Sequence, residues 1–261
     1  MTAQARMKGR ATTTSRTWLA AGAIASAVAL AVGCGSGSGD GQDESAALPR
    51  GSEPLQLDPA DFVDGIDNEY WPMAPGSKWV YEETDEEGNM LRVEVTVTDE
   101  TKKILGIDAT VVHDVVTENG ELKEDTFDWY AQDKDGNVWY LGEDTKEYEG
   151  GKVKSTKGSW EAGVDGAQAG VIMPAAPRVG LVYRQEYYKD EAEDRGEILA
   201  LGERVEVPYG TFEDVLKTKD TTPLEPDVLE HKYYAKDVGP VLTVDVGGGG
   251  GREELLTFER G

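Results

Sequence analysis

The 261-residue sequence contains one cysteine and two histidines, and its 26 Lys and Arg residues are outnumbered by 51 Asp and Glu residues. A single cysteine excludes an intramolecular disulfide and a zinc site built from four cysteines. The net charge of −25 excludes a nucleic-acid-binding protein, because neutralising phosphates requires clustered basic side chains. The Gly-x-Ser-x-Gly and Ser-x-x-Lys motifs of nucleophilic catalysis are also missing, so we expect a non-enzymatic protein.

The N-terminal segment indicates export. Four basic residues and no acid precede an apolar run over residues 18–32, which ends in the small residues before Cys34. A basic region, a short apolar run and small residues at the cut are typical of a secretory signal, here residues 1–33. An ordinary signal peptide or a single membrane span with an incidental cysteine is the alternative, but the run is shorter than the roughly 20 residues that a span needs.

The sequence Ala31-Val32-Gly33-Cys34 resembles the cleavage box of bacterial lipoprotein signals, with Ala31 at the position most often held by Leu. The resemblance implies cleavage before Cys34 and attachment of diacylglyceryl to its thiol, with acylation (palmitate) or a free amine at the new N-terminus. The protein would then be anchored by lipid on the extracytoplasmic face of the cell membrane. Cleavage would change the net charge from −25 to −29, so anionic headgroups would repel the domain and lipid would have to hold it.

The rest of the chain divides into a linker and one folded domain. Residues 34–57 are rich in Gly, Ser and acidic residues without periodicity, which predicts a flexible linker. Within residues 58–261, Val93, Val95 and Val97 alternate with polar residues, as in a half-buried strand. An Asn-Gly turn signal at 118–121 and an Asp-Gly signal at 132–137 predict hairpins. No segment after the signal shows an apolar stripe with helical spacing and capping residues. The domain is predicted to be all-β and mostly antiparallel.

An internal repeat is predicted from two pairs of similar segments. Residues 75–82 resemble 179–186, and 129–133 resemble 233–237, both at an offset of 104. We interpret the domain as two repeated antiparallel β-meanders, about 60–170 and 171–261. Each meander is small for an independent core, so the two are predicted to pair into one curved sheet or half-open barrel. The alternative is that two acidic β segments resemble each other by chance.

The most distinctive segment is Tyr70-Trp71-Pro72-Met73-Ala74-Pro75-Gly76-Ser77-Lys78-Trp79-Val80-Tyr81. It resembles the P-x-x-P-G-x-x-W-x-Y opening of a group of uncharacterised bacterial lipoproteins and secreted β-proteins, and the resemblance extends from Phe62 to Phe258. The resemblance implies a β fold and no catalytic residues. In this sequence, Pro75-Gly76 predicts a turn, and Trp79 and Tyr81 begin a strand with aromatic side chains on one face.

Three kinds of site remain possible. An apolar concave sheet face could hold a hydrophobic ligand, or the same aromatic residues could simply fill it; the candidates are Phe127, Trp129, Tyr140, Tyr183 and Tyr187. Asp133, Asp135 and Asn137 alternate in a turn, as in Ca²⁺ loops, although the spacing departs from the EF-hand and a hairpin turn is the alternative. Paired carboxylates of a hydrolase are the third possibility, but 51 acids make such pairs unspecific.

We therefore predict a membrane-tethered protein that binds a ligand or a protein partner, with a Ca²⁺-stabilised surface module or a hydrolase as alternatives.

Overall fold

The computed structural model describes residues 47–85, 88–247 and 250–261, so the predicted signal peptide and Cys34 lie outside the described residues. Apart from one short 3₁₀ helix, η1 (Pro59–Asp61), the regular structure in these ranges is β-sheet. The all-β prediction is confirmed. Over the same ranges, no helix is long and apolar enough to cross a membrane.

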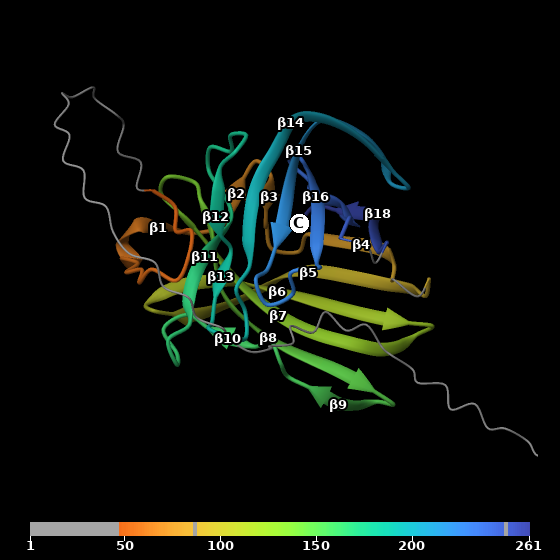
Figure 1. Ribbon diagram of the computed structural model, residues 1–261, viewed down its shortest axis with the longest axis horizontal. Coiled ribbons are helices and arrows are strands. Elements are labelled where there is room, and N and C mark those ends of the chain that lie inside the picture. The colour runs from red at the N-terminus through yellow and green to blue at the C-terminus, as the bar shows by residue number, and fades with distance from the viewer. Residues whose placement is uncertain (1–46, 86–87, 248–249) are drawn as a thin grey trace, which may run out of the picture.

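One large antiparallel sheet, made of two meanders, forms most of the molecule (Figure 1). The first meander contains β4 (Lys78–Thr84), β5 (Met90–Ile104), β6 (Ile107–Glu118), β7 (Glu121–Asp133), β8 (Val138–Glu149) and β11 (Gln168–Met173). The second contains β12 (Val182–Arg184), β14 (Arg195–Val207), β15 (Gly210–Thr221), β16 (Leu229–Ala235), β17 (Gly239–Asp245) and β18 (Arg252–Glu259). Short strands flank them: β1 (Phe62–Val63), β9 (Lys152–Ser155), β10 (Trp160–Glu161) and β13 (Glu186–Tyr187).

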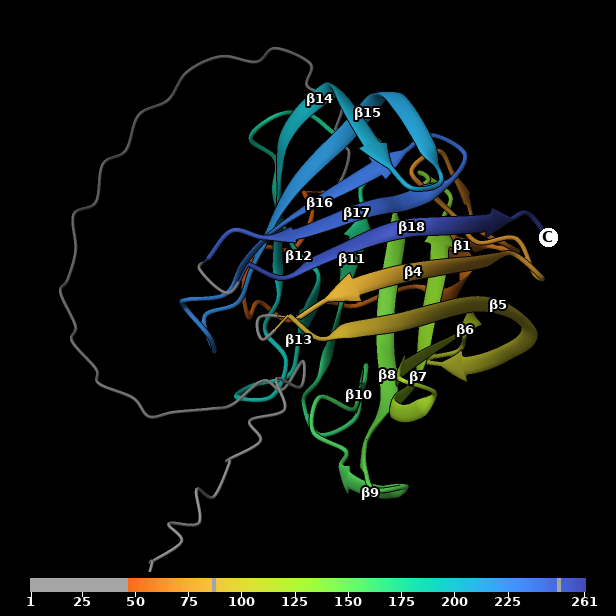
Figure 2. The same cartoon turned by 90° about the vertical axis from the view of Figure 1, so that its right-hand side faces the viewer.

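The sheet curves until its two ends meet. The last strand, β18, pairs with β4, which joins the meanders into one sheet; Figure 2 shows β16, β17, β18, β4 and β5 side by side. At the other junction β12 pairs with β14 and β13 pairs with β11, and only Gln185 separates β12 from β13. The segment Val182–Tyr187 therefore links both ends of the sheet, and the curved, barrel-like sheet predicted from the sequence is confirmed.

The two predicted hairpins form where the turn signals lie. Asn119 and Gly120 both have positive φ (52° and 83°), the backbone that a tight two-residue turn between β6 and β7 requires. The loop between β7 and β8 closes with Gly136 at φ 94°. Alternation along β5 also holds, because Val93 and Val97 are buried while their polar neighbours are partly exposed.

The segments related by the offset of 104 occupy equivalent strands of the two meanders. Residues 75–82 include most of β4, and residues 179–186 include β12; each is the first strand of its half. Residues 129–133 form the end of β7, and residues 233–237 include the end of β16; each is the fourth strand of its half. The predicted boundary between 170 and 171 falls inside β11, which pairs with β8 of the first meander. The halves therefore separate after β11, since β11 needs β8 to satisfy its backbone hydrogen bonds.

The packed part of the chain begins earlier than the predicted boundary at residue 58. Leu48–Leu57, which we call the N-terminal strap, lies within the predicted 34–57 linker, yet its leucines pack against the core. The Nη1 of Arg184 donates hydrogen bonds to the carbonyl oxygens of Gly51 (2.5 Å) and Glu53 (3.0 Å). Arg184 is 1% exposed, and a buried guanidinium needs such acceptors. The strap is therefore held by a residue 131 positions from Glu53 along the chain, which no local pattern reveals.

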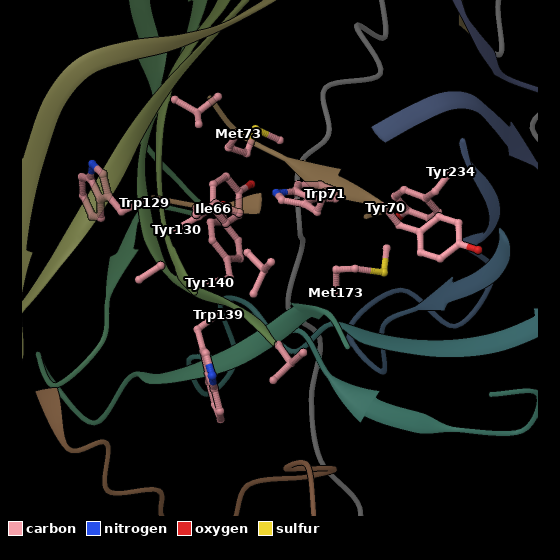
Figure 3. Packing of buried hydrophobic residues seen from close by; sticks show 14 of the residues in the cluster. Ile66, Tyr70, Trp71, Met73, Trp129, Tyr130, Trp139, Tyr140, Met173 and Tyr234 are labelled. Carbon is pink, nitrogen blue, oxygen red and sulfur yellow. The ribbon is translucent and has the colours of Figure 1, made fainter. Parts of the chain in front are cut away.

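A small hairpin packs against the inner face of the sheet. It consists of β2 (Asp67–Asn68) and β3 (Trp71–Pro72), and its backbone is fixed by Gln132, whose Oε1 accepts hydrogen bonds from the amides of Asp67 (3.0 Å) and Asn68 (2.9 Å). We call residues 66–73 the inner hairpin. It buries Ile66, Trp71 and Met73, and in Figure 3 Trp71 lies between Tyr130 and Tyr234.

Candidate functional site

The curved sheet encloses a cavity of about 440 Å³. Side chains from both meanders and from the inner hairpin line it, and the volume lies in the range of small-molecule sites. The sequence left open whether the concave face is hollow or filled, and in this part of the structure it is hollow.

One end of the cavity is aromatic. Trp71 packs edge-on against Tyr130 of β7, with centroids 5.6 Å apart, and at a tilt against Tyr234 of β16, at 5.9 Å. Tyr130 in turn stacks on Tyr140 of β8 at 4.8 Å. Burial raises the pKa of all three tyrosines, so their hydroxyls stay neutral. Tyr130 and Tyr234 are related by the offset of 104, so the two meanders contribute equivalent rings on either side of Trp71.

Trp71 also brings a polar atom to this end. The side chain is 8% exposed, and its Nε1 has no hydrogen-bond acceptor among the described residues. An unsatisfied buried donor costs about 1–3 kcal/mol. The aromatic end therefore contains one N–H group that an acceptor on a ligand would satisfy.

The other end of the cavity is acidic. Fourteen Asp and Glu residues and only two lysines, Lys157 and Lys232, line the cavity as a whole. On β7 the cavity-facing side chains run from Glu124 and Asp128 to Tyr130, and on β16 they run from Glu230 to Tyr234. The strands that run in the opposite direction show the reverse order. On β4, Trp79 and Tyr81 come before Glu83, and on β8, Tyr140 comes before Glu143 and Glu147. Because these directions alternate, the acids of all four strands gather at one end and the rings at the other.

Several of these acids face one another directly across the ladder. Glu124 is paired with Glu147 between β7 and β8, and Glu83 with Glu253 between β4 and β18. The ladder therefore places acidic side chains opposite one another at this end of the cavity.

Three carboxyl groups of the wall, those of Glu143, Glu186 and Asp194, have raised pKa values. Glu186 is 5% exposed, and its Oε2 accepts a hydrogen bond from Nε1 of Trp160 at 2.8 Å. Burial raises the pKa of Glu186 to about 7. Burial and the charge of Glu186 raise the pKa of Glu143 and Asp194 well above the usual range. Oδ1 of Asp194 has no hydrogen-bond partner in the described part of the chain. The three carboxyl groups therefore keep their protons to higher pH than ordinary carboxyl groups do.

Of the five predicted ligand-binding aromatics, Tyr140 lines the cavity, and its hydroxyl donates a 2.6 Å hydrogen bond to Asp128. Phe127 and Trp129 belong to the opposite face of β7, since side chains alternate along a strand. Phe127 stacks on His113 at 4.3 Å, and the Nζ of Lys102 lies 3.1 Å from the ring centre of Trp129.

The two remaining aromatics lie near the closure of the sheet. Tyr183 is fully buried with its ring over Gly196, where a Cβ atom would come within 2.6 Å of it. Tyr187 of β13 lies near Arg184, whose guanidinium carbon is 6.0 Å from its ring centre. Neither residue belongs to the cavity wall in the described structure.

The sequence reasoning missed the acids of the cavity wall, although a signal was present. In β7, Glu124, Asp128 and Tyr130 are separated by even numbers of residues, so their side chains lie on the same face of the strand. The same holds for Glu230 and Tyr234 in β16. The alternation reveals the two faces of each strand, whereas only closure of the sheet decides which face is inside.

The predicted calcium loop has its oxygens engaged within the turn. Asp133 accepts hydrogen bonds from the amide and the Nδ2 of Asn137 and from Nε1 of Trp139, each at 2.8 Å. Oδ1 of Asn137 accepts from the amide of Ala175 at 2.9 Å, while Asp135 is exposed. Among the described residues, no three His, Cys, Asp or Glu side chains are placed to hold a metal ion. Calcium binding by Asp133, Asp135 and Asn137 stays a prediction, and the geometry gives these residues a role in closing the hairpin.

Comparison with known proteins gives distant structural matches. No family model and no curated protein matches the chain. One solved structure, an inferred exported protein with a YmcC-like fold from Bacteroides fragilis, aligns with a TM-score of 0.41 at 13% identity, over 74% of this chain and all of its own. A second, an inferred lipoprotein from Parabacteroides distasonis, aligns with a TM-score of 0.40 at 13% identity, over 76% of this chain and all of its own.

Proposed function

We propose that this chain is a membrane-tethered, non-enzymatic extracytoplasmic lipoprotein that binds a small ligand inside its curved sheet. The signal-like segment and Cys34 support export and lipid anchoring. The observation that carries the binding role is the cavity of about 440 Å³ at the centre of the sheet. A domain that served only as a scaffold would gain stability by filling that space with side chains.

The arrangement of the wall supports binding of a small molecule more than docking of a protein. The cavity is concave and enclosed by strands of both meanders, with rings at one end and carboxyl groups at the other. Small-molecule sites are typically concave clefts or cavities, and this cavity is concave.

Native mass spectrometry tests the proposal on the full chain carrying Cys34→Ser, exported by a host and purified without detergent. We expect a bound mass of roughly a few hundred daltons, the size that such a cavity admits. Val95→Trp places a large side chain in the cavity wall and should remove the adduct. Val153→Trp, at an exposed position of β9, is the matched control and should keep it.

A second measurement covers a ligand that is lost during purification. The neutral fluorophore N-phenyl-1-naphthylamine should gain fluorescence with the wild-type cavity and with Val153→Trp, but not with Val95→Trp. A correctly folded chain with neither an adduct nor a fluorescence gain would overturn the proposal.

One observation favours the hydrolase alternative: Glu186 and Asp194 are buried neighbours with raised pKa values, as acid–base carboxyls often are. Turnover of a glycoside or ester that Glu186→Gln abolishes, with unchanged fold and unchanged binding, would establish an enzyme in place of a carrier.

A further inference from the structure

We propose that the cavity selects an uncharged, largely apolar ligand that carries a hydrogen-bond acceptor, such as a carbonyl or ether oxygen, and that Nε1 of Trp71 donates the hydrogen bond that recognises it. This inference rests on the proposed function, because it names the chemical class that the same cavity takes and the residue that selects it.

The need for an acceptor follows from the indole of Trp71. An indole Nε1 is a donor only, so an acceptor is the one kind of polar group that satisfies it. Trp71 lines the cavity and is 8% exposed, and its Nε1 is buried without an acceptor among the described residues. A ring face accepts an N–H group only weakly in comparison with an oxygen. The donor therefore offers an oxygen-bearing ligand an interaction that a hydrocarbon cannot make.

Two other buried tryptophans have the acceptor that Trp71 lacks. Nε1 of Trp79 donates to the carbonyl oxygen of Val238 at 2.8 Å, and Nε1 of Trp160 donates to Oε2 of Glu186 at 2.8 Å. Trp79 lines the same cavity as Trp71. The unsatisfied donor is therefore a property of the indole at the aromatic end and is not shared by the other indole of the cavity wall.

The apolar part of the ligand follows from the rings around Trp71. Tyr130 and Tyr234 lie on either side of the indole, with centroids 5.6 and 5.9 Å away, and Tyr140 stacks on Tyr130 at 4.8 Å (Figure 3). Such ring surfaces bind apolar and aromatic groups. Gln132 fixes the backbone of the inner hairpin through two hydrogen bonds, so the donor is held in place before a ligand arrives.

The lack of charge on the ligand follows from the cost of burying an ion beside these rings. An anion would need a cationic partner, and the lysines of the described cavity wall are Lys157, which is exposed, and Lys232. Lys232 already forms ion pairs with Asp220 and Glu230, both at 3.2 Å. An ammonium or guanidinium group has no acceptor to offer to Trp71. A neutral oxygen satisfies the donor without burying a charge.

Three probes with one shared naphthalene body test this class: 2-acetylnaphthalene, 2-isopropenylnaphthalene and 2-naphthoate. The isopropenyl compound has a CH₂ group in place of the carbonyl oxygen of the ketone and keeps its shape. Displacement of N-phenyl-1-naphthylamine from the full Cys34→Ser chain measures the affinities. The ketone should bind at least about fivefold more tightly than the alkene, the usual gain from one neutral hydrogen bond, and the carboxylate should bind most weakly.

Trp71→Phe removes the donor and keeps an aromatic ring. The ketone and the alkene should then bind within about twofold of each other, because the lost ring area affects both alike. Trp79→Phe is the matched control: it makes the same replacement in the cavity wall, at an indole whose Nε1 is already engaged by Val238, and should keep the preference for the ketone.

Nuclear magnetic resonance on the Cys34→Ser chain covers the case in which Trp71→Phe does not fold. The indole N–H resonance of Trp71 should shift downfield when the ketone is added and should not do so with the alkene, since only the ketone accepts a hydrogen bond. An N–H resonance that responds equally to both compounds would contradict the inference.

The outcomes separate the two proposals. Equal binding of the ketone and the alkene, a preference that persists in Trp71→Phe, or tighter binding of the carboxylate overturns this inference and leaves a ligand-binding cavity. Failure of all three probes to displace a bound fluorophore also overturns this inference alone. Where a native adduct is found without fluorophore binding, the N–H resonance of Trp71 decides. Absence of both the adduct and fluorophore binding overturns both proposals.

Discussion

The protonation of Glu186 provides a test of the buried acidic wall that needs no ligand. In the folded chain its pKa is about 7, against an ordinary value of 4.5. A carboxyl whose pKa is raised by folding contributes its full stabilisation below pH 4.5, and this contribution is lost as the pH rises through 7. The difference of about 2.5 pKa units corresponds to about 3 kcal/mol, at 1.36 kcal/mol per unit.

Glu186→Gln replaces the carboxyl with a neutral group of the same shape that still accepts the hydrogen bond of Trp160. The free energy of unfolding of this variant, relative to wild type, should therefore increase by up to about 3 kcal/mol between pH 4.5 and pH 8. Urea denaturation followed by tryptophan fluorescence measures this difference. Glu206→Gln, which is exposed, should show no such trend. A constant difference for Glu186→Gln across this range would refute the argument that burial keeps the group protonated.

Four further changes test other parts of the structure. Cys34→Ala should release the protein from membranes and abolish labelling with radioactive acyl chains; unchanged membrane association would contradict lipid anchoring. Arg184→Met should lower the free energy of unfolding by about 3 kcal/mol, because three carbonyl groups of the strap and the sheet lose a charged hydrogen-bond donor. The N-terminal strap should also become accessible to limited proteolysis, and a strap that stays resistant would argue against this anchor. Gly142→Ala should cost more than about 3 kcal/mol by thermal denaturation, since its φ is +135° and the new Cβ would lie 2.2 Å from the carbonyl oxygen of Trp160. The control Gly166→Ala, at φ +87° in open space, should cost only about 1 kcal/mol. Asp133→Ala should lower the melting temperature in the presence of chelator, because three hydrogen bonds of the turn are lost. If millimolar Ca²⁺ raised the melting temperature of the wild type by several degrees and left that of Asp133→Ala unchanged, the predicted calcium loop would be established instead.

The sequence alone determined the local structure of this protein. Alternation at Val93, Val95 and Val97 predicts a half-buried strand, and Asn119-Gly120 predicts a tight hairpin, because both depend only on neighbouring side chains and on backbone preference. The strand and turn signals also predicted one curved antiparallel sheet, which the strand order confirms. That the two halves are repeats of one another stays a prediction.

Only the tertiary structure decided which face of each strand is inside. Phe127 and Asp128 are equally good candidates in the sequence, and a shift of one residue exchanges the two faces of β7. Closure of the sheet through Val182–Tyr187 directs Asp128 and Tyr130 inward and Phe127 outward. The gathering of acids at one end likewise depends on strand direction and pairing between residues far apart in the chain. These are properties of the closed sheet, and no local pattern in the sequence contains them.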